Sequence, residues 1–203
     1  MELIDRYGRR IRYLRLSVTD RCNLRCRYCM PAEGVRKRHH REILSYEELF
    51  RVAEEAVALG IDKIRLTGGE PLVRKGIVAF SERLAGLPGL NELVLTTNGL
   101  LLEELAAPLR NAGVKRLNIS LDSMNPGTFA DITRGGELQR VLDGIDAAMA
   151  AGFPPPKINM VVMAGINDSE VLDFARLTLT RAFTVRFIEY MPNLLEPDWE
   201  KHC

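Results

Sequence analysis

The sequence has no apolar run that approaches the roughly 18–20 residues needed to cross a membrane as a helix. Its first five residues lack the basic-then-apolar layout of a secretory signal. Cysteine is scarce, with 4 in a chain of 203 residues, whereas a secreted disulfide-built scaffold is short and cysteine-rich. These absences argue against a membrane partner and a disulfide framework, and they make a reducing cytoplasm the expected compartment.

The chain as a whole also has no large charge imbalance, because it contains 28 Lys and Arg residues and 27 Asp and Glu residues. The distribution is uneven, however. Residues 6–41 carry twelve basic side chains against two acids, Asp20 and Glu33. Such a block suits an anionic ligand, such as a nucleoside triphosphate. A solvated surface or a nucleic-acid contact would give the same charge pattern, so charge alone leaves these alternatives open.

Apolar periodicity predicts strands that alternate with helices along the whole chain. Strands are expected at residues 13–18, 63–67, 92–96, 116–120, 157–162 and 185–190. Helices are expected from the capping box at Ser45 to a stop at Gly60, and at 77–87, 101–111, 138–151 and 169–179. With 46% hydrophobic residues, the chain is long enough for one core. The pattern favours a single α/β domain with a parallel sheet and right-handed crossovers.

Distinctive short motifs follow the first four expected strands. They are the cysteine loop, Gly68-Gly-Glu-Pro71, Thr97-Asn-Gly99 and Leu121-Asp-Ser123. In parallel α/β folds the ligand site gathers beyond the carboxyl ends of the strands. We therefore expect these loops to form one site.

Three of the four cysteines, Cys22, Cys26 and Cys29, fall within eight residues. Dense thiolates without a secretory signal indicate a metal, and thiolates hold iron–sulfur clusters. Three ligands leave one iron of a four-iron cluster open, as a reactive metal site requires. A zinc knuckle, a disulfide and ordinary buried cysteines are the alternatives. Zinc normally needs a second spaced pair, and the remaining candidates do not form one (Cys203, His39, His40 and His202).

Three longer strings carry a resemblance to a known family: LRLSVTDRCNLRCRYCMP at 14–31, RLTGGEPL at 65–72 and RFIEYMP at 186–192. The cysteine spacing followed by Gly-Gly-Glu-Pro resembles the radical S-adenosylmethionine (SAM) superfamily, and the full set of strings resembles its GTP 3′,8-cyclase family. The resemblance implies a partial (β/α)6 TIM-like barrel, a [4Fe–4S] cluster on Cys22, Cys26 and Cys29, and SAM bound to the open iron.

The same resemblance implies a lyase of molybdenum-cofactor biosynthesis. Reductive cleavage of SAM would give a 5′-deoxyadenosyl radical that abstracts the ribose 3′ hydrogen of GTP, and the product would be 3′,8-cyclo-7,8-dihydro-GTP. It also implies an electron donor such as flavodoxin or ferredoxin, while nucleic acid is not an expected partner.

The resemblance assigns SAM contacts to Tyr28, Gly69, Ser120 and Met191. It assigns GTP contacts to Arg15, Arg65, Thr96 and Lys157. Three of these GTP residues are cations in apolar strands, where a buried charge normally needs a partner. An ion pair with Asp122, Glu70 or Glu189 would satisfy them without a ligand, as would a position facing water. Tyr28 and Met191 have alternative roles as packing residues.

The chain ends at Cys203, just past the sixth strand. By resemblance, the family continues with three more cysteines for a second cluster, a basic loop and a tail ending in two glycines. We therefore expect residues 1–203 to be one radical SAM core domain, possibly a fragment, in which cyclisation is impaired. Its exposed sheet edge invites association, with a homodimer as one form. Cys203 is expected to be an incidental thiol.

Two other functions stay open from the sequence. The first keeps the radical chemistry but acts on another substrate, such as a peptide. The second is a non-catalytic metal-binding module that uses its basic face for RNA or a protein partner. The Gly-Gly-Glu-Pro string at the end of a strand argues against the second.

Overall fold

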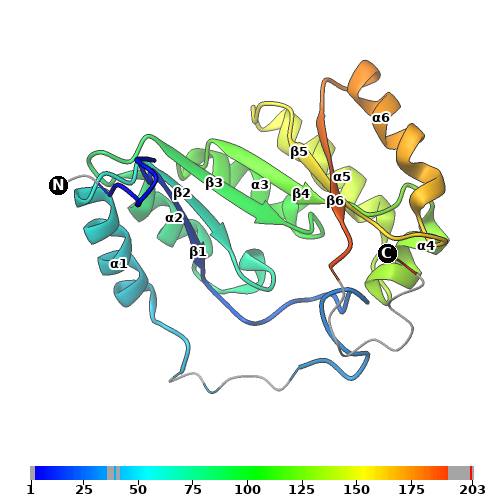
Figure 1. Ribbon diagram of the computed structural model, residues 1–203, viewed down its shortest axis with the longest axis horizontal. Coiled ribbons are helices and arrows are strands. Elements are labelled where there is room, and N and C mark those ends of the chain that lie inside the picture. The colour runs from blue at the N-terminus through cyan, green and yellow to red at the C-terminus, as the bar shows by residue number, and fades with distance from the viewer. Residues whose placement is uncertain (1–2, 36–38, 40–41, 192–201, 203) are drawn as a thin grey trace.

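The computed structural model describes residues 3–35, 39, 42–191 and 202 (Figure 1). One sheet of six parallel strands organises them, in the order β1-β2-β3-β4-β5-β6. The strands are β1 (Tyr13–Ser17), β2 (Lys63–Thr67), β3 (Glu92–Thr97), β4 (Arg116–Ser120), β5 (Lys157–Val162) and β6 (Thr184–Glu189). Spatial order follows chain order, so each connection joins neighbouring strands. The predicted arc is confirmed: the sheet is an open, TIM-like partial barrel.

Helices cover one face of this sheet. They are α1 (Tyr46–Ala58), α2 (Ile77–Ala85), α3 (Leu102–Asn111), α4 (Pro126–Thr133), α5 (Leu138–Ala150) and α6 (Val171–Thr180), with short 3-10 turns η2 (Pro71–Val73) and η3 (Asp168–Glu170). Figure 1 shows α2, α3 and α5 lying behind the strands. Their apolar stripes bury one hydrophobic core against residues such as Ile64, Leu95 and Ile119, none of which is exposed.

The two faces of the sheet differ because side chains alternate along each strand. Leu14 and Leu16 pair in register with Ile64 and Leu66 and face the helices. The intervening residues face the other way, onto what we call the concave face. The register assigns to it the residues Arg15, Ser17, Arg65, Val94, Thr96, Asn118, Ser120, Lys157, Asn159 and Arg186.

Most element boundaries agree with the sequence prediction. The capping box that starts α1 is confirmed: Ser45 Oγ accepts from Glu48 N, and the Glu48 carboxylate accepts from Ser45 N. The exception is α4, which lies in a stretch predicted to be irregular. It begins at Asn125, whose side chain accepts from Gly127 N and Thr128 N, with proline at the first helical position.

In the described part of the chain, no helix is long and apolar enough to cross a membrane. Two residues considered as zinc ligands, His40 and Cys203, lie outside the described residues. Of the other two, His39 is exposed, and His202 Nδ1 lies 3.0 Å from Ala164 O. The contacts of His39 and His202 among the described residues are therefore with Glu42 and Ala164 and not with the cysteine loop.

Candidate functional site

The cysteine loop begins where β1 ends, and backbone bonds continue the β1–β2 pairing into it. Val18 N donates to Thr67 O at 2.9 Å. Beyond the strands, Gly69 N donates to Thr19 O and Glu70 N donates to Arg21 O, each at 2.7 Å. The Gly-Gly-Glu-Pro loop is thereby tied to the residues just before Cys22.

Close packing of these two loops explains the glycine pair. A Cβ on Gly69 would lie 2.2 Å from Arg21 O, and one on Gly68 would lie 2.4 Å from Thr19 O. Gly68 also has a φ of +149°, a conformation that favours glycine. The immediate reason for the glycines is therefore contact between two backbones of this chain. Whether Gly69 also contacts a cofactor stays a prediction.

Glu70 is a buried carboxylate that holds three loops together. It is 1% exposed and accepts hydrogen bonds from Leu72 N at 3.0 Å, Thr97 Oγ1 at 2.9 Å and Asn98 N at 2.7 Å. Burial raises the pKa of Glu70, and the three hydrogen bonds oppose that rise. Its side chain is thus committed to the framework of the site.

The loop after β3 reaches the cysteine loop through Asn98. Asn98 Nδ2 lies 2.8 Å from Asn23 Oδ1 and 3.9 Å from Cys22 Sγ. Cys22 Sγ also accepts a hydrogen bond from Leu24 N at 3.4 Å. The sequence motif predicted that this loop belongs to the site, but it indicated no role for Asn98.

The end of α4 supports the other side of the cysteine loop. Arg25 N donates to Thr133 O at 3.2 Å, and Arg27 N donates to Ile132 O at 2.9 Å. Arg134 adopts a left-handed conformation, with φ of 55°, and its guanidinium donates to Arg25 O and Met30 O. The helix that the sequence analysis missed therefore positions the cysteines.

Tyr28 connects the cysteine loop to the ends of β4 and β5. Its hydroxyl donates to Asp122 Oδ2 at 2.7 Å, and Asp122 Oδ1 accepts from Val161 N at 2.8 Å. Burial raises the pKa of Asp122 to about 6. Asn167 is fully buried and donates to both Asp122 O and Val161 O. The packing role considered for Tyr28 is therefore observed, and a ligand contact stays a prediction.

Cys22, Cys26 and Cys29 are free thiols, so the disulfide alternative is not supported. Burial raises the pKa of all three thiols, for Cys29 to about 11. Metal coordination deprotonates a thiol outright and so supplies the compensating charge. Among the described residues, no three His, Cys, Asp or Glu side chains are gathered so that they would hold a single metal ion. Three separate soft donors fit a multi-iron cluster, whose irons take one thiolate each, better than a preformed zinc site.

The predicted GTP residues share the concave face. Arg15 pairs in register with Arg65, and Thr96 and Lys157 both pair with Asn118. Burial and the nearby Arg186 lower the pKa of Lys157. Burial, with Arg186 and Arg15, likewise lowers the pKa of Arg65. The mutual repulsion shows that this face concentrates positive charge.

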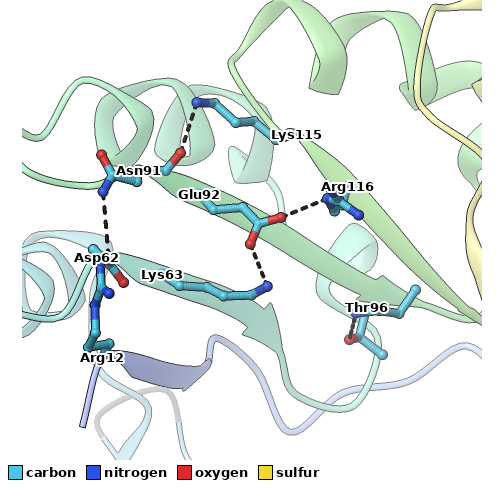
Figure 2. A network of polar contacts seen from close by, with 9 residues as sticks. Arg12, Asp62, Lys63, Asn91, Glu92, Thr96, Lys115 and Arg116 are labelled. Atoms are coloured by element: carbon cyan, nitrogen blue, oxygen red, sulfur yellow. Dashed lines mark hydrogen bonds and ion pairs between the residues drawn. The ribbon is translucent and has the colours of Figure 1, made fainter. Parts of the chain in front are cut away.

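Among the described residues, the ion pairs considered as an alternative for these cations are not formed, whereas the alternative of a position facing water holds for Arg15, which is exposed. Glu70 and Asp122 are committed to the hydrogen bonds described above, and no ion pair of Glu189 is recorded. The carboxylate that does form ion pairs on this face is Glu92, which contacts Lys63 and lies 2.8 Å from Arg116 Nε. Figure 2 shows this network at the amino-terminal end of the strands, with Thr96 further along the sheet.

Two buried polar atoms in the described part of the chain lack a hydrogen-bond partner, Arg65 Nε and Asn159 Oδ1. Both residues belong to the concave face, where Asn159 pairs in register with Ser120 and Arg186. Buried polar groups are normally satisfied, so an orphaned pair on one face indicates a ligand site. Arg186 was quoted in a sequence string without a role; its alternation with Val185, which packs against the core, would have placed it on this face.

The predicted SAM residues are spread around the carboxyl edge. Ser120 ends β4 on the concave face, while Met191 follows β6 and is 81% exposed. Tyr190 beside it is buried with Ile132 and Met163. The structure thus brings Tyr28, Gly69 and Ser120 to loops or strand ends of one edge and leaves the Met191 side chain in solvent.

Solved structures confirm the fold. Methylornithine synthase superposes with a TM-score of 0.73 at 15% identity, over 91% of this chain and 55% of that protein. SuiB of Streptococcus suis, bound to S-adenosylmethionine, gives a TM-score of 0.73 at 15% identity, over 92% of this chain and 41% of that protein.

Curated relatives are much closer in sequence. The GTP 3′,8-cyclase of Geobacter sulfurreducens is 74% identical over 98% of this chain and 61% of its own length. That of Peptoclostridium acidaminophilum is 60% identical over 94% of this chain and 58% of its own length. The chain therefore spans about three fifths of the length of these relatives.

A family comparison agrees with the geometry. Residues 16–178, which include the cysteine loop, the end of β1 and all of β2 to β5, match the radical SAM superfamily. Enzymes of this family use a [4Fe–4S] cluster together with S-adenosylmethionine. The chain belongs to the radical SAM superfamily.

Proposed function

We propose that this chain provides the radical-generating and GTP-binding core of a GTP 3′,8-cyclase. The observation that carries the proposal is the concave face, where Arg15, Arg65 and Lys157 have no carboxylate partner among the described residues and the orphaned Arg65 Nε and Asn159 Oδ1 lie in strands that lead up to the cysteine loop. The names of the relatives at 74% and 60% identity support the choice of substrate.

Cys22, Cys26 and Cys29 would hold the [4Fe–4S] cluster. When bound, the cluster and SAM supply a 5′-deoxyadenosyl radical. The loops around Glu70 and Asp122 keep the three thiols in place through buried hydrogen bonds. The chain thus orients and shields reactive groups while the cofactors carry out the difficult chemistry.

Tyr28, Gly69, Ser120 and Met191 are the residues we propose to contact SAM. Tyr28 and Ser120 border the cysteine loop and the concave face, with the Tyr28 ring held by its bond to Asp122. Gly69 has no side chain, and its backbone packs directly against the backbone of Arg21. Met191 is exposed and able to move toward a ligand.

Arg15, Arg65, Thr96 and Lys157 are the residues we propose to bind GTP. A triphosphate would neutralise the crowded positive charge and supply acceptors for the guanidinium groups, which suit bidentate contact with phosphate. Asn118 Nδ2 donates to Thr96 Oγ1 at 3.4 Å, so the threonine hydroxyl keeps a hydrogen to donate.

The reaction we propose for the complete enzyme is a lyase step of molybdenum-cofactor biosynthesis. The ribose 3′ hydrogen of GTP passes to the 5′-deoxyadenosyl group, and the ribose carbon then bonds to C8 of guanine. One further electron from the electron donor and one proton convert the resulting purine radical to 3′,8-cyclo-7,8-dihydro-GTP. The electron donor, for which flavodoxin or ferredoxin is expected, and a homodimer and cytoplasmic location stay predictions. Because the chain spans about three fifths of the length of these relatives, formation of the carbon–carbon bond by residues 1–203 alone is expected to be impaired.

Anaerobic reconstitution with iron and sulfide, followed by SAM and a reductant, tests the radical chemistry. The chain should yield 5′-deoxyadenosine, and Cys26→Ala should yield none. A wild-type chain that gives no product, or Cys26→Ala with an undiminished yield, would reject this part of the proposal.

Calorimetric titration with GTP tests the substrate. Replacing both Arg65 and Lys157 by methionine keeps the apolar stems and should weaken binding by at least about a hundredfold, since each lost charge-assisted bond costs roughly 1.5–3 kcal/mol. Arg176→Met, on the exposed surface of α6, is the matched control and should bind GTP normally. Equal affinity in the wild type and the double variant would favour another substrate, such as a peptide.

A further inference from the structure

Asn98 follows β3, and its neighbours fix the orientation of its side-chain amide. Asn98 Oδ1 accepts a hydrogen bond from Leu100 N at 3.1 Å, which assigns the oxygen to that end of the amide. Nδ2 then faces the cysteine loop, 2.8 Å from Asn23 Oδ1 and 3.9 Å from Cys22 Sγ. An amide held in this way presents hydrogen atoms, rather than lone pairs, to the first cysteine.

A buried carboxylate holds Asn98 in this position. Glu70 accepts from Asn98 N at 2.7 Å and from Thr97 Oγ1 at 2.9 Å. Glu70 N itself donates to Arg21 O, immediately before Cys22. The same residue therefore fixes both the amide and the start of the cysteine loop, so their relative position belongs to the buried framework.

We propose that Asn98 is a positioning residue for the ligand Cys22 and that its amide raises the reduction potential of the cluster by donating a hydrogen bond to the Cys22 sulfur. Hydrogen bonds to cluster sulfurs help set the potential, because they stabilise the extra negative charge of the reduced state. Leu24 N, 3.4 Å from the same sulfur, is a second donor. The inference rests on the proposed cluster and adds a residue that controls how readily it accepts an electron.

The test measures the midpoint potential of the cluster in the reconstituted 203-residue chain, together with its iron content and thermal unfolding. Asn98→Asp keeps an oxygen for Leu100 N but loses the donor and adds charge, so its potential should shift to more negative values. Asn98→Ser replaces the amide donor by a shorter hydroxyl group without adding charge, and it should shift the potential in the same direction by less. Both variants should retain the wild-type iron content.

Asn23→Ala is the matched control, because it removes the other partner of Asn98 Nδ2, an oxygen that also lies 4.0 Å from Cys22 Sγ, and leaves Cys22 Sγ as the acceptor. Its potential should not shift to more negative values. An equal shift in Asn23→Ala and Asn98→Ser would overturn the proposal in favour of a simple link between loops.

Two other outcomes would also overturn the proposal. A loss of iron from both folded Asn98 variants would make the residue a structural brace, and wild-type potentials in both would remove its role. A wild-type chain that binds no iron–sulfur cluster would instead reject the proposed function, so the two failures are distinguishable.

Discussion

Charged side chains at the carboxyl edge of the sheet and on its concave face differ in sign and in their partners. At the edge the buried charges are carboxylates, and Glu70 and Asp122 each accept several hydrogen bonds from neighbouring loops. On the concave face Glu92 pairs with Lys63 and Arg116, but in the described part of the chain no carboxylate lies within ion-pair distance of Arg15, Arg65 or Lys157. The carboxylates of the first region are satisfied by the protein itself, whereas in the second region Arg15 is exposed and Arg65 and Lys157 are partly exposed, so these cations are available to an anionic ligand.

This difference separates two kinds of functional residue. A satisfied buried group rigidifies its surroundings, so the edge is suited to holding three cysteines in fixed positions. An unsatisfied group raises the free energy of the empty protein, and binding of an anion recovers that cost. Substitutions at the edge should therefore reduce stability, and charge removal on the concave face should not.

Glu70→Leu should have the largest effect. It leaves three buried donors, on Leu72, Thr97 and Asn98, without an acceptor, at a cost of roughly 4 kcal/mol in unfolding free energy. Glu70→Gln keeps one acceptor oxygen and should lose less than half as much. Urea unfolding of the metal-free chain measures both, and equal stability of Glu70→Leu and wild type would contradict the role assigned to the edge.

Gly69→Ala should destabilise the chain by about 2 kcal/mol, because its Cβ would lie 2.2 Å from Arg21 O and force the two loops apart. Gly86→Ala is the control: Gly86 has a φ of −78°, and the nearest atom to its added Cβ is 3.6 Å away. The control should be neutral or slightly stabilising. If both variants unfold at the same urea concentration, the close approach at Gly69 does not contribute to the unfolding free energy.

The pKa of Asp122 predicts a pH effect of similar or smaller size. Burial raises it to about 6 from an ordinary value of 3.8, so the folded state binds the extra proton. The resulting stability is complete below about pH 4 and is lost as the pH rises through about 6. The unfolding free energy of wild type relative to Asp122→Asn should fall by about 2 kcal/mol over this range.

Tyr28→Phe is the control for this pH series, because it removes the hydroxyl but keeps the titrating carboxylate. Its stability should still decline with pH, and over a range that extends to higher pH, because the hydrogen bond from Tyr28 no longer lowers the pKa of Asp122. Parallel pH profiles for wild type and Asp122→Asn would show that the carboxyl group titrates alike in the folded and unfolded chains.

Arg65→Met should have the smallest effect on stability and the clearest contrast with the edge. It removes a partly buried cation whose Nε has no partner, so the unfolding free energy should stay within about 1 kcal/mol of wild type or rise. GTP affinity should nevertheless fall at least tenfold. A large loss of stability in the ligand-free variant would mean that Arg65 is a structural residue.

Much of this arrangement was predictable from the sequence. Cys22, Cys26 and Cys29 follow a strand, and the alternation of Arg15 with Leu14 and Leu16 places a cation opposite the helix-covered face. These features depend on local spacing, which fixes the direction of each side chain in a strand. The strand pattern likewise predicted the parallel sheet.

Features that depend on contacts between distant segments were not predictable. α4 was missed although Asn125 and a following proline are a recognisable helix start. The role of Asn98 requires the spatial meeting of Glu70, Leu100 and Cys22, which are separated in sequence. Arg65 was recognised as a buried cation, but only the three-dimensional structure shows that Glu70 and Asp122 are committed elsewhere.

Transfer of deuterium from GTP labelled at the ribose 3′ carbon tests the central claim most directly, since it requires both regions to act on one molecule. The reconstituted chain is mixed with SAM, a reductant and labelled GTP, and the mass of 5′-deoxyadenosine is measured. The account predicts deuterium in the 5′-deoxyadenosine from wild type and its loss when Arg65 and Lys157 are both replaced by methionine. Unlabelled 5′-deoxyadenosine in the presence of saturating labelled GTP would contradict it.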